Sequence, residues 1–148
     1  MKNARSLLSY IPDRGIKPRK DGLTMVMDKG LSLREAENFI SVGSEYVDFV
    51  KLGFGTSVIT PDADKKIKLY NKAGMTTYLG GTLFEAFIIR GMFKEYVEFI
   101  KSLEITMVEI SDGSYEFPHE DKLNYIRILS KDFTVVSEVG SKKKDVIY

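Results

Sequence analysis

Charged side chains stand at or just beyond the ends of several apolar segments, and their types suggest anion and metal chemistry. Lys51 lies in a segment that is otherwise apolar, so its ammonium must face a wet cavity or pair with a neighbouring strand's acid. Glu109 and Glu138 end two later apolar segments, and Asp28 and Asp112 stand in similar places. Carboxylate oxygens are the ligands that Mg²⁺ prefers, and the ion keeps water for its substrate. The pattern predicts one rim that holds a cation and an anionic substrate.

A glycine pair offers a second kind of anion contact. Gly80, Gly81 and Thr82 directly precede a helical pattern. Backbone amides at the start of a helix, reinforced by the helix dipole, could therefore bind an anion there. Glycine pairs at strand ends more commonly form a tight turn that has no ligand. The sequence leaves both interpretations open.

Other polar residues are assigned away from the rim. His119, the single histidine, stands beside a proline at an expected helix start and is left out of the site. Asp48 falls on the opposite strand face from Lys51, where a helix cap or a buried ion pair is its expected role. Lys142 begins a run of three lysines that is typical of a solvated surface, although a phosphate could reach it just past the last strand.

Five short apolar segments must position these side chains. They cover residues 23–27, 47–52, 75–79, 105–110 and 133–136, and their starts lie 24, 28, 30 and 28 residues apart. This near-constant spacing predicts repeated β-α units that form a parallel sheet. Such sheets bind ligands outside the carboxyl ends of their strands, which is where the charged residues stand.

Four helices are expected between and after these strands, over residues 32–42, 61–73, 82–100 and 118–129. Two of them begin with the pattern of a capping box, Ser32 with Glu35 and Thr82 with Glu85. Gly91 weakens the third helix locally.

The predicted fold class is α/β, of the TIM-type (β/α)8 barrel family. A closed barrel takes about 250 residues, so five strands and four helices in 148 residues form an incomplete one. Residues 1–21 are expected to form an N-terminal arm and residues 22–148 the partial β/α barrel domain. An open sheet of this kind leaves its strand edges exposed.

The composition narrows the classes of partner. A hydrophobic content of 43% fits a globular chain, and a net charge of +1 gives no overall field for nucleic acid or an anionic membrane. Cysteine is absent, which excludes disulfides and thiol chemistry. No apolar run suits a signal peptide or a membrane span, so the expected location is cytoplasmic.

The turns, taken together, resemble those of the phosphosulfolactate synthase family. The resemblance covers residues 22–142 and rests on the stretches 22–30, 46–57, 80–85, 108–113 and 137–140, which occur in the family's order and at its spacing. The resemblance implies a carbon-sulfur lyase that adds sulfite to phosphoenolpyruvate with Mg²⁺, giving (2R)-3-phosphosulfolactate. Such a product feeds coenzyme M biosynthesis in methanogens and is associated with sulfolactate formation in bacteria.

The resemblance also implies roles for individual residues. Metal coordination, directly or through water, is expected of Glu109, Glu138 and Asp112. Lys51 is expected to neutralise a substrate anion, and Lys142 is the candidate acid or a further anion contact. Substrate binding is expected of Lys29, Gly80, Gly81, Thr82 and Ser111.

The carboxyl end departs from the family pattern, because the family's segments beyond the fifth strand have no counterpart here. A truncated synthase is therefore expected, with a homo-oligomer as the expected assembly. Two alternatives stay open: a non-catalytic half-barrel assembly module with exposed strand edges, and a related barrel enzyme that acts on another phosphorylated enol or keto acid.

Overall fold

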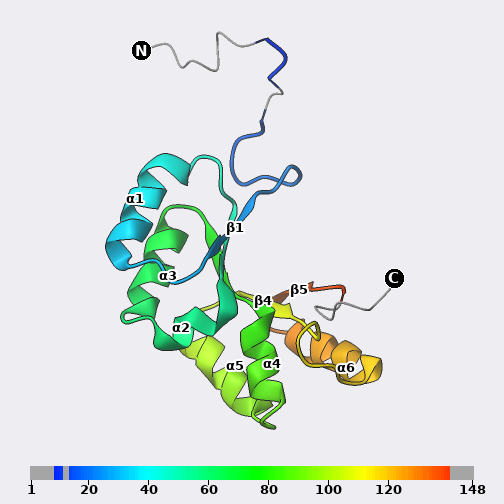
Figure 1. Ribbon diagram of the computed structural model, residues 1–148. Helices are drawn as coiled ribbons and strands as arrows, with labels where there is room; N and C mark the ends of the chain where they lie inside the picture. The colour runs from blue at the N-terminus through cyan, green and yellow to red at the C-terminus, as the bar shows by residue number, and fades with distance from the viewer. Residues whose placement is uncertain (1–8, 12–13, 141–148) are drawn as a thin grey trace.

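The computed structural model describes residues 9–11 and 14–140, which form an α/β fold around one five-stranded sheet (Figure 1). All neighbouring strands are parallel, and their order in the sheet is their order in the chain. The strands are β1 (Met25–Asp28), β2 (Phe49–Leu52), β3 (Thr76–Leu79), β4 (Met107–Ile110) and β5 (Thr134–Ser137). The five predicted strands and their parallel pairing are confirmed. Closure of the sheet into a barrel is not seen in the part of the chain that is described.

Helices follow every strand except the last described one. They are α1 (Leu33–Gly43), α2 (Thr56–Ile59), α3 (Ala63–Lys72), α4 (Gly81–Ile88), α5 (Phe93–Ser102) and α6 (His119–Leu129), with a short 3₁₀ turn, η2 (Gly53–Gly55), before α2. At the β1 end of the sheet α1 packs against α3, and α6 lies at the β5 end (Figure 1). None of the helices in the described ranges is both long and apolar enough to cross a bilayer.

The prediction of four helices is wrong, since the described chain contains six α-helices. The long helix predicted over residues 82–100 is two helices, α4 and α5, because Gly91 adopts a left-handed φ of 68° between them. The helix predicted from Pro61 begins instead at Ala63, because Asp62 before it has a φ of 56°. The four-residue helix α2 was not anticipated.

One capping box is confirmed and the other is wrong. Ser32 and Glu35 cap α1 reciprocally, side chain to backbone in both directions. At α4 the N-cap residue is Gly80, which has no side chain to contribute, and Glu85 is buried and bonded elsewhere.

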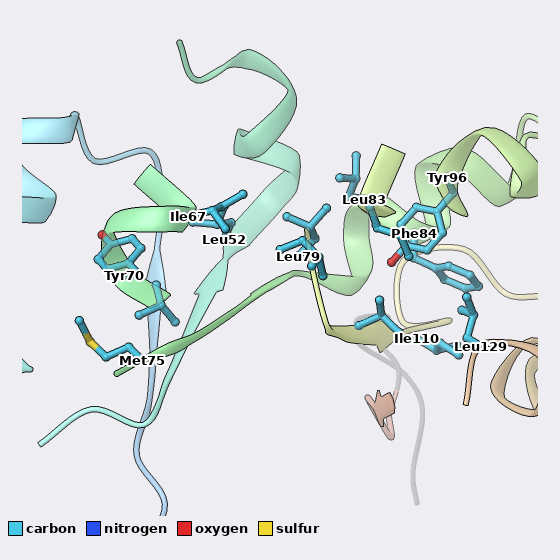
Figure 2. Packing of buried hydrophobic residues seen from close by; sticks show 14 of the residues in the cluster. Leu52, Ile67, Tyr70, Met75, Leu79, Leu83, Phe84, Tyr96, Ile110 and Leu129 are labelled. Carbon is cyan, nitrogen blue, oxygen red and sulfur yellow. The ribbon is translucent and has the colours of Figure 1, made fainter. Parts of the chain in front are cut away.

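The hydrophobic core lies on the helix-covered face of the sheet. Side chains alternate between the two faces of a strand, and the members that join the core are Val50, Leu52, Leu79, Val108 and Ile110. Figure 2 shows how Leu52 and Ile67 pack at one end of this core, while Phe84, Tyr96 and Leu129 pack at the other. On the opposite face Met25 and Met27 remain 47% and 38% exposed. That face carries the polar side chains from which a site can be built.

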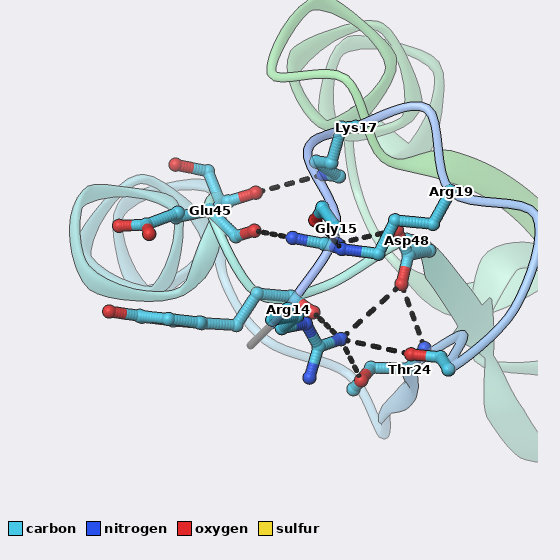
Figure 3. Close-up of polar contacts among 10 residues, drawn as sticks. Arg14, Gly15, Lys17, Arg19, Thr24, Glu45 and Asp48 are labelled. Carbon is cyan, nitrogen blue, oxygen red and sulfur yellow. Dashed lines mark hydrogen bonds and ion pairs between the residues drawn. The ribbon is translucent and has the colours of Figure 1, made fainter. Parts of the chain in front are cut away.

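Residues 14–19 fasten the amino end of the sheet through Asp48, which directly precedes β2 (Figure 3). Arg19 donates to its Oδ1 at 2.7 Å, and the Thr24 amide donates to its Oδ2 at 2.8 Å. Burial would raise the pKa of Asp48, but the Thr24 amide and the Arg19 guanidinium hold it below its usual range. The predicted buried ion pair is confirmed. The division into an arm of residues 1–21 and a domain of residues 22–148 stays a prediction.

A second buried carboxylate, Asp28, holds the loop after β1. Its Oδ2 lies 2.9 Å from the Lys66 ammonium and accepts a hydrogen bond of 2.9 Å from the Tyr70 hydroxyl. Its Oδ1 accepts from the amides of Gly30 and Leu31, both at 2.8 Å. Asp28 was expected on the site rim, but it is in register with Leu52 and therefore faces the helices. Its role is structural.

The Asp28 network generates a prediction about acid stability. Burial alone would raise the pKa of Asp28, but the Lys66 ammonium and the loop amides hold it below the unfolded value of about 3.9. A carboxyl group with a lowered pKa stabilises the fold fully above its unfolded pKa, and this stabilisation is lost as the pH falls through the folded pKa. We expect Asp28→Asn to lower the free energy of unfolding at pH 7 by about 3 kcal/mol, because Lys66 loses its partner.

Between pH 5 and pH 3, the free energy of unfolding of the Asp28→Asn variant should fall less steeply than that of the wild type. Urea unfolding at each pH measures both. Asp62→Asn is the matched control, since Asp62 is exposed and its pair with Lys65 lies on the surface. An unchanged acid dependence in Asp28→Asn would contradict the assigned role of Asp28.

Candidate functional site

Residues from all five strands line a hollow of about 290 Å³ on the sheet face away from the core. Its lining residues are Met25, Lys51, Tyr78, Glu109, Val136, Ser137 and Glu138. Three of them, Lys51, Glu109 and Glu138, are residues that the sequence placed on a common rim. Because parallel strands in chain order bring their alternate side chains to one face, residues 87 positions apart in the chain (Lys51 to Glu138) meet here.

An ion pair between Lys51 and Glu109 crosses the hollow. The Lys51 Nζ lies 2.7 Å from the Glu109 Oε1, and the side chains are 15% and 5% exposed. Lys51 belongs to β2 and Glu109 to β4, so the pair reaches over Tyr78 of β3, which is the Cα partner of Lys51. Removing one member of such a pair leaves an uncompensated charge in a poorly solvated place. Lys51 therefore has both of its predicted surroundings, an open cavity and an acidic partner.

The glycine pair makes room for this ion pair. A Cβ on Gly80 would stand 2.9 Å from the Lys51 Cε and 3.2 Å from the Leu52 carbonyl oxygen. A Cβ on Gly81 would stand 2.4 Å from the Ser111 Cβ and 3.2 Å from the Glu109 Oε1. The Gly80 amide donates to the Leu52 carbonyl at 2.9 Å, which removes it from the set of amides offered to an anion. Gly81 and Thr82 begin α4, where amides lack intrahelical acceptors, so their predicted role in substrate binding stays a prediction.

Glu85 of α4 supports the loop that follows β4. Its Oε1 accepts a short hydrogen bond from the Ser111 hydroxyl, and its Oε2 accepts from the amides of Ser114 and Tyr115, both at 3.0 Å. The Ser111 Oγ also lies 3.1 Å from the Glu138 Oε2. Ser111, expected to bind substrate, is fully buried and links Glu85 to Glu138. The sequence reasoning missed Glu85, because it had placed this residue in a capping box; its position beside the buried Leu83 and Phe84 was the available signal.

Two further predicted site residues, Asp112 and Lys29, lie away from the hollow, and a third, Lys142, is not among the described residues. Asp112 pairs with Lys122 at 2.6 Å, and Lys122 also donates to the Glu138 carbonyl at 2.7 Å. Lys29 lines a separate hollow of about 540 Å³ between the start of α1 and the α2–α3 turn, with its Nζ 5.5 Å from the centre of the Phe54 ring. Lys142 lies outside the described residues.

The donor set fits part of a magnesium site. Within residues 9–11 and 14–140, no three acidic or histidine side chains form a cluster that could hold a metal by themselves. Glu109 and Glu138 nevertheless line the same hollow. Magnesium is usually held by one or two carboxylates, with water and substrate oxygens completing its shell. Two carboxylates beside an open hollow fit that requirement, whereas Asp112 pairs with Lys122 and does not line this hollow.

Tyr78 is a lining residue that the sequence reasoning also missed. It is 5% exposed, and its burial, followed by the charges of Glu109 and Glu138, raises the pKa of its hydroxyl to about 12. The phenol is therefore neutral and protonated at physiological pH. Its strand, Thr76–Leu79, was predicted, but a tyrosine in an apolar strand carries no signal of its own.

Comparisons with known proteins agree on one family. Residues 12–147 match the family described as (2R)-phospho-3-sulfolactate synthase (ComA). The chain is 44% identical over 127 residues to a phosphosulfolactate synthase of Methanocaldococcus jannaschii, covering 84% of this chain and 51% of that protein. It is 38% identical over 134 residues to one of Methanothermobacter thermautotrophicus (88% and 52%) and 35% identical over 136 residues to one of Bacillus subtilis (92% and 54%). The chain spans about half the length of the curated relatives it matches.

The glycine geometry predicts a sharp difference between two neighbouring replacements. Gly81→Ala should lower the free energy of unfolding by about 2 kcal/mol or more, because the new methyl group would overlap the Ser111 Cβ, which cannot move without its backbone. Gly80→Ala should cost less, because the flexible end of Lys51 can move aside. Chemical denaturation measures both values. Gly15→Ala, whose methyl group would meet no atom within 4 Å, is the control, and equal stabilities of all three variants would contradict this packing.

The Glu85 contacts predict a local effect. Glu85→Gln keeps the side-chain volume but leaves one carbonyl oxygen in place of two carboxylate oxygens, so it cannot accept from Ser111 and both loop amides. We expect faster hydrogen exchange at the Ser114 and Tyr115 amides, and a loss of about 1–3 kcal/mol in unfolding free energy. Glu98→Gln on the exposed surface of α5 is the control. Unchanged exchange at both amides would refute the supporting role.

Proposed function

Because this chain belongs to the (2R)-phospho-3-sulfolactate synthase family, we propose that it carries a phosphosulfolactate synthase site that adds sulfite to phosphoenolpyruvate. The observation that carries the proposal is the Lys51–Glu109 pair, which shares one open hollow with Glu138 at the carboxyl half of a parallel sheet. An anionic substrate requires a cation and an accessible space, and a hard metal ion requires carboxylate ligands such as Glu109 and Glu138.

The proposed chemistry follows from the substrates. The sulfur lone pair of sulfite forms a bond to the methylene carbon of phosphoenolpyruvate, and the electrons of the double bond move towards the carboxylate. The Lys51 ammonium would stabilise the charge that collects there, because a preorganised cation in a poorly solvated site acts most strongly on developing charge. A proton must then reach the neighbouring carbon, which yields (2R)-3-phosphosulfolactate. Lys142, beyond the described residues, keeps its place as the candidate acid.

The metal and the fold complete the proposal. Glu109 and Glu138 would hold Mg²⁺ together with water, and the ion would supply further neutralisation of the substrate's carboxylate. Five parallel strands in chain order, with the core on one face, suit the first part of a TIM-type barrel. We propose this barrel as the architecture of the complete enzyme. The cytoplasmic location, the homo-oligomer and the pathways suggested by the family stay predictions.

One observation favours a second function, a half-barrel assembly module. Each of the edge strands, β1 and β5, has a single neighbour in the described sheet, and Met25 and Met27 of β1 are partly exposed. Unpaired strand edges are templates for pairing with another chain. Sedimentation distinguishes the two cases, since a stable monomer would count against edge pairing.

The other alternative, a related barrel enzyme that acts on another phosphorylated substrate, is tested by comparing the products formed with and without sulfite.

The proposal predicts the behaviour of a three-variant set. Lys51→Ala and Glu109→Ala should each lower sulfite-dependent turnover of phosphoenolpyruvate by about tenfold or more, and each should lower stability by leaving one buried charge alone. The double variant should recover part of the stability but none of the activity. Product is measured by mass spectrometry in the presence of Mg²⁺, and stability by urea unfolding.

A purely structural pair would give the opposite result, with turnover recovering together with stability in the double variant. Lys65→Ala on the exposed surface is the control. If the chain alone forms no product, the same variants are tested in a form extended by the second half of a relative, which separates a missing segment from a wrong assignment.

A further inference from the structure

Tyr78 lies on the central strand of the sheet and lines the hollow, yet it has no part in the contacts described so far. It lies on β3, between the strand of Lys51 and the strand of Glu109, and it is the Cα partner of both Lys51 and Met107. Glu109 follows Met107 by two residues, so the three polar side chains share one face of the sheet. Figure 2 shows its neighbour Leu79 on the core side, as alternation requires.

The Tyr78 hydroxyl is available to a ligand. It makes no hydrogen bond to any residue in the described ranges. It is also not sealed in the interior, because the buried side-chain atoms without a partner in those ranges are Arg14 Nε, Ser57 Oγ, Thr77 Oγ1 and Tyr96 OH. A hydroxyl of a buried tyrosine that has no protein partner and opens onto a hollow is costly unless water or a ligand accepts a hydrogen bond from it.

The charges around the hydroxyl define what it can bind. Glu109 and Glu138 repel an anionic ligand, and Lys51, a cation that lines the same hollow, is already paired with Glu109. An anion that enters the hollow therefore gains from every additional hydrogen-bond donor. A phenol hydroxyl is such a donor, and it needs no counter-ion of its own.

We propose that Tyr78 is a substrate-binding residue whose hydroxyl donates a hydrogen bond to an anionic oxygen of the ligand in this hollow. The inference rests on the proposed function only for the identity of that ligand. The hydroxyl orients the ligand beside Lys51, so that the ammonium faces the charge that develops during the reaction. No proton leaves Tyr78 in this role.

Isothermal titration calorimetry tests the proposal with three probes in Mg²⁺ buffer: phosphoenolpyruvate, inorganic phosphate and sulfite. Tyr78→Phe should weaken the binding of at least one probe by about tenfold or more, because a hydrogen bond to a charged oxygen is lost. Tyr125→Phe is the matched control, since Tyr125 packs among Phe84, Phe93 and Phe117 on the helix side of the sheet. Thermal unfolding checks that both variants keep the wild-type fold.

A second measurement needs no variant. In wild-type protein labelled with ¹³C at the tyrosine ζ carbon, the Tyr78 resonance should shift when the bound probe reaches saturation, and the Tyr125 resonance should stay unchanged. Wild-type affinity in Tyr78→Phe, or an unmoved Tyr78 resonance, would overturn the proposal. So would the failure of all three probes to bind the wild type.

The outcomes also separate this proposal from the proposed function. Binding of phosphate or sulfite that depends on Tyr78, without any binding of phosphoenolpyruvate, supports the donor role and counts against the synthase function. Binding of phosphoenolpyruvate that is indifferent to Tyr78 supports the function and refutes the donor role.

Discussion

The strict alternation of side chains along five parallel strands is the constraint on which this structure depends. One set of alternate residues, including Val50, Leu52, Leu79 and Val108, is buried beneath the helices and forms the core. The other set carries Lys51, Tyr78 and Glu109 into the hollow. Because burial of the apolar set fixes the register, it also fixes which polar residues meet. The ion pair of the site is therefore positioned by the hydrophobic core behind it.

The loops at the carboxyl edge are held from behind by buried charged side chains of the helices. Lys66 of α3 holds the loop after β1 through Asp28 and the Leu31 carbonyl. Glu85 of α4 holds the loop after β4, and Lys122 of α6 joins that loop to the Glu138 backbone. Each of these groups is paired, as a charge removed from water must be. The rim thus depends on helix residues that do not themselves line the hollow.

This arrangement changes the meaning of several motifs on which the resemblance to the family was based. Glycine stands at both positions for a steric reason, because the absence of a side chain lets Lys51 and Glu109 lie against the backbone of Gly80 and Gly81. Ser111 connects two carboxylates in the interior. A motif can therefore mark a site through packing and support as well as through direct contact with a ligand.

Local signals in the sequence determined the strands, the parallel sheet, the first helix cap and the presence of Lys51, Glu109 and Glu138 at strand ends. These follow from short-range periodicity and residue type, which adjacent positions are enough to define. The family followed from the resemblance of the turns to known motifs. Tertiary structure alone decided that Lys51 pairs with Glu109 and that Asp28 faces the helices. It also decided that Glu85 supports a distant loop instead of capping its own helix, and that Tyr78 opens onto the hollow. Each of these depends on which residues meet across 26 or more positions of the chain, and that is set by register and packing rather than by any local pattern.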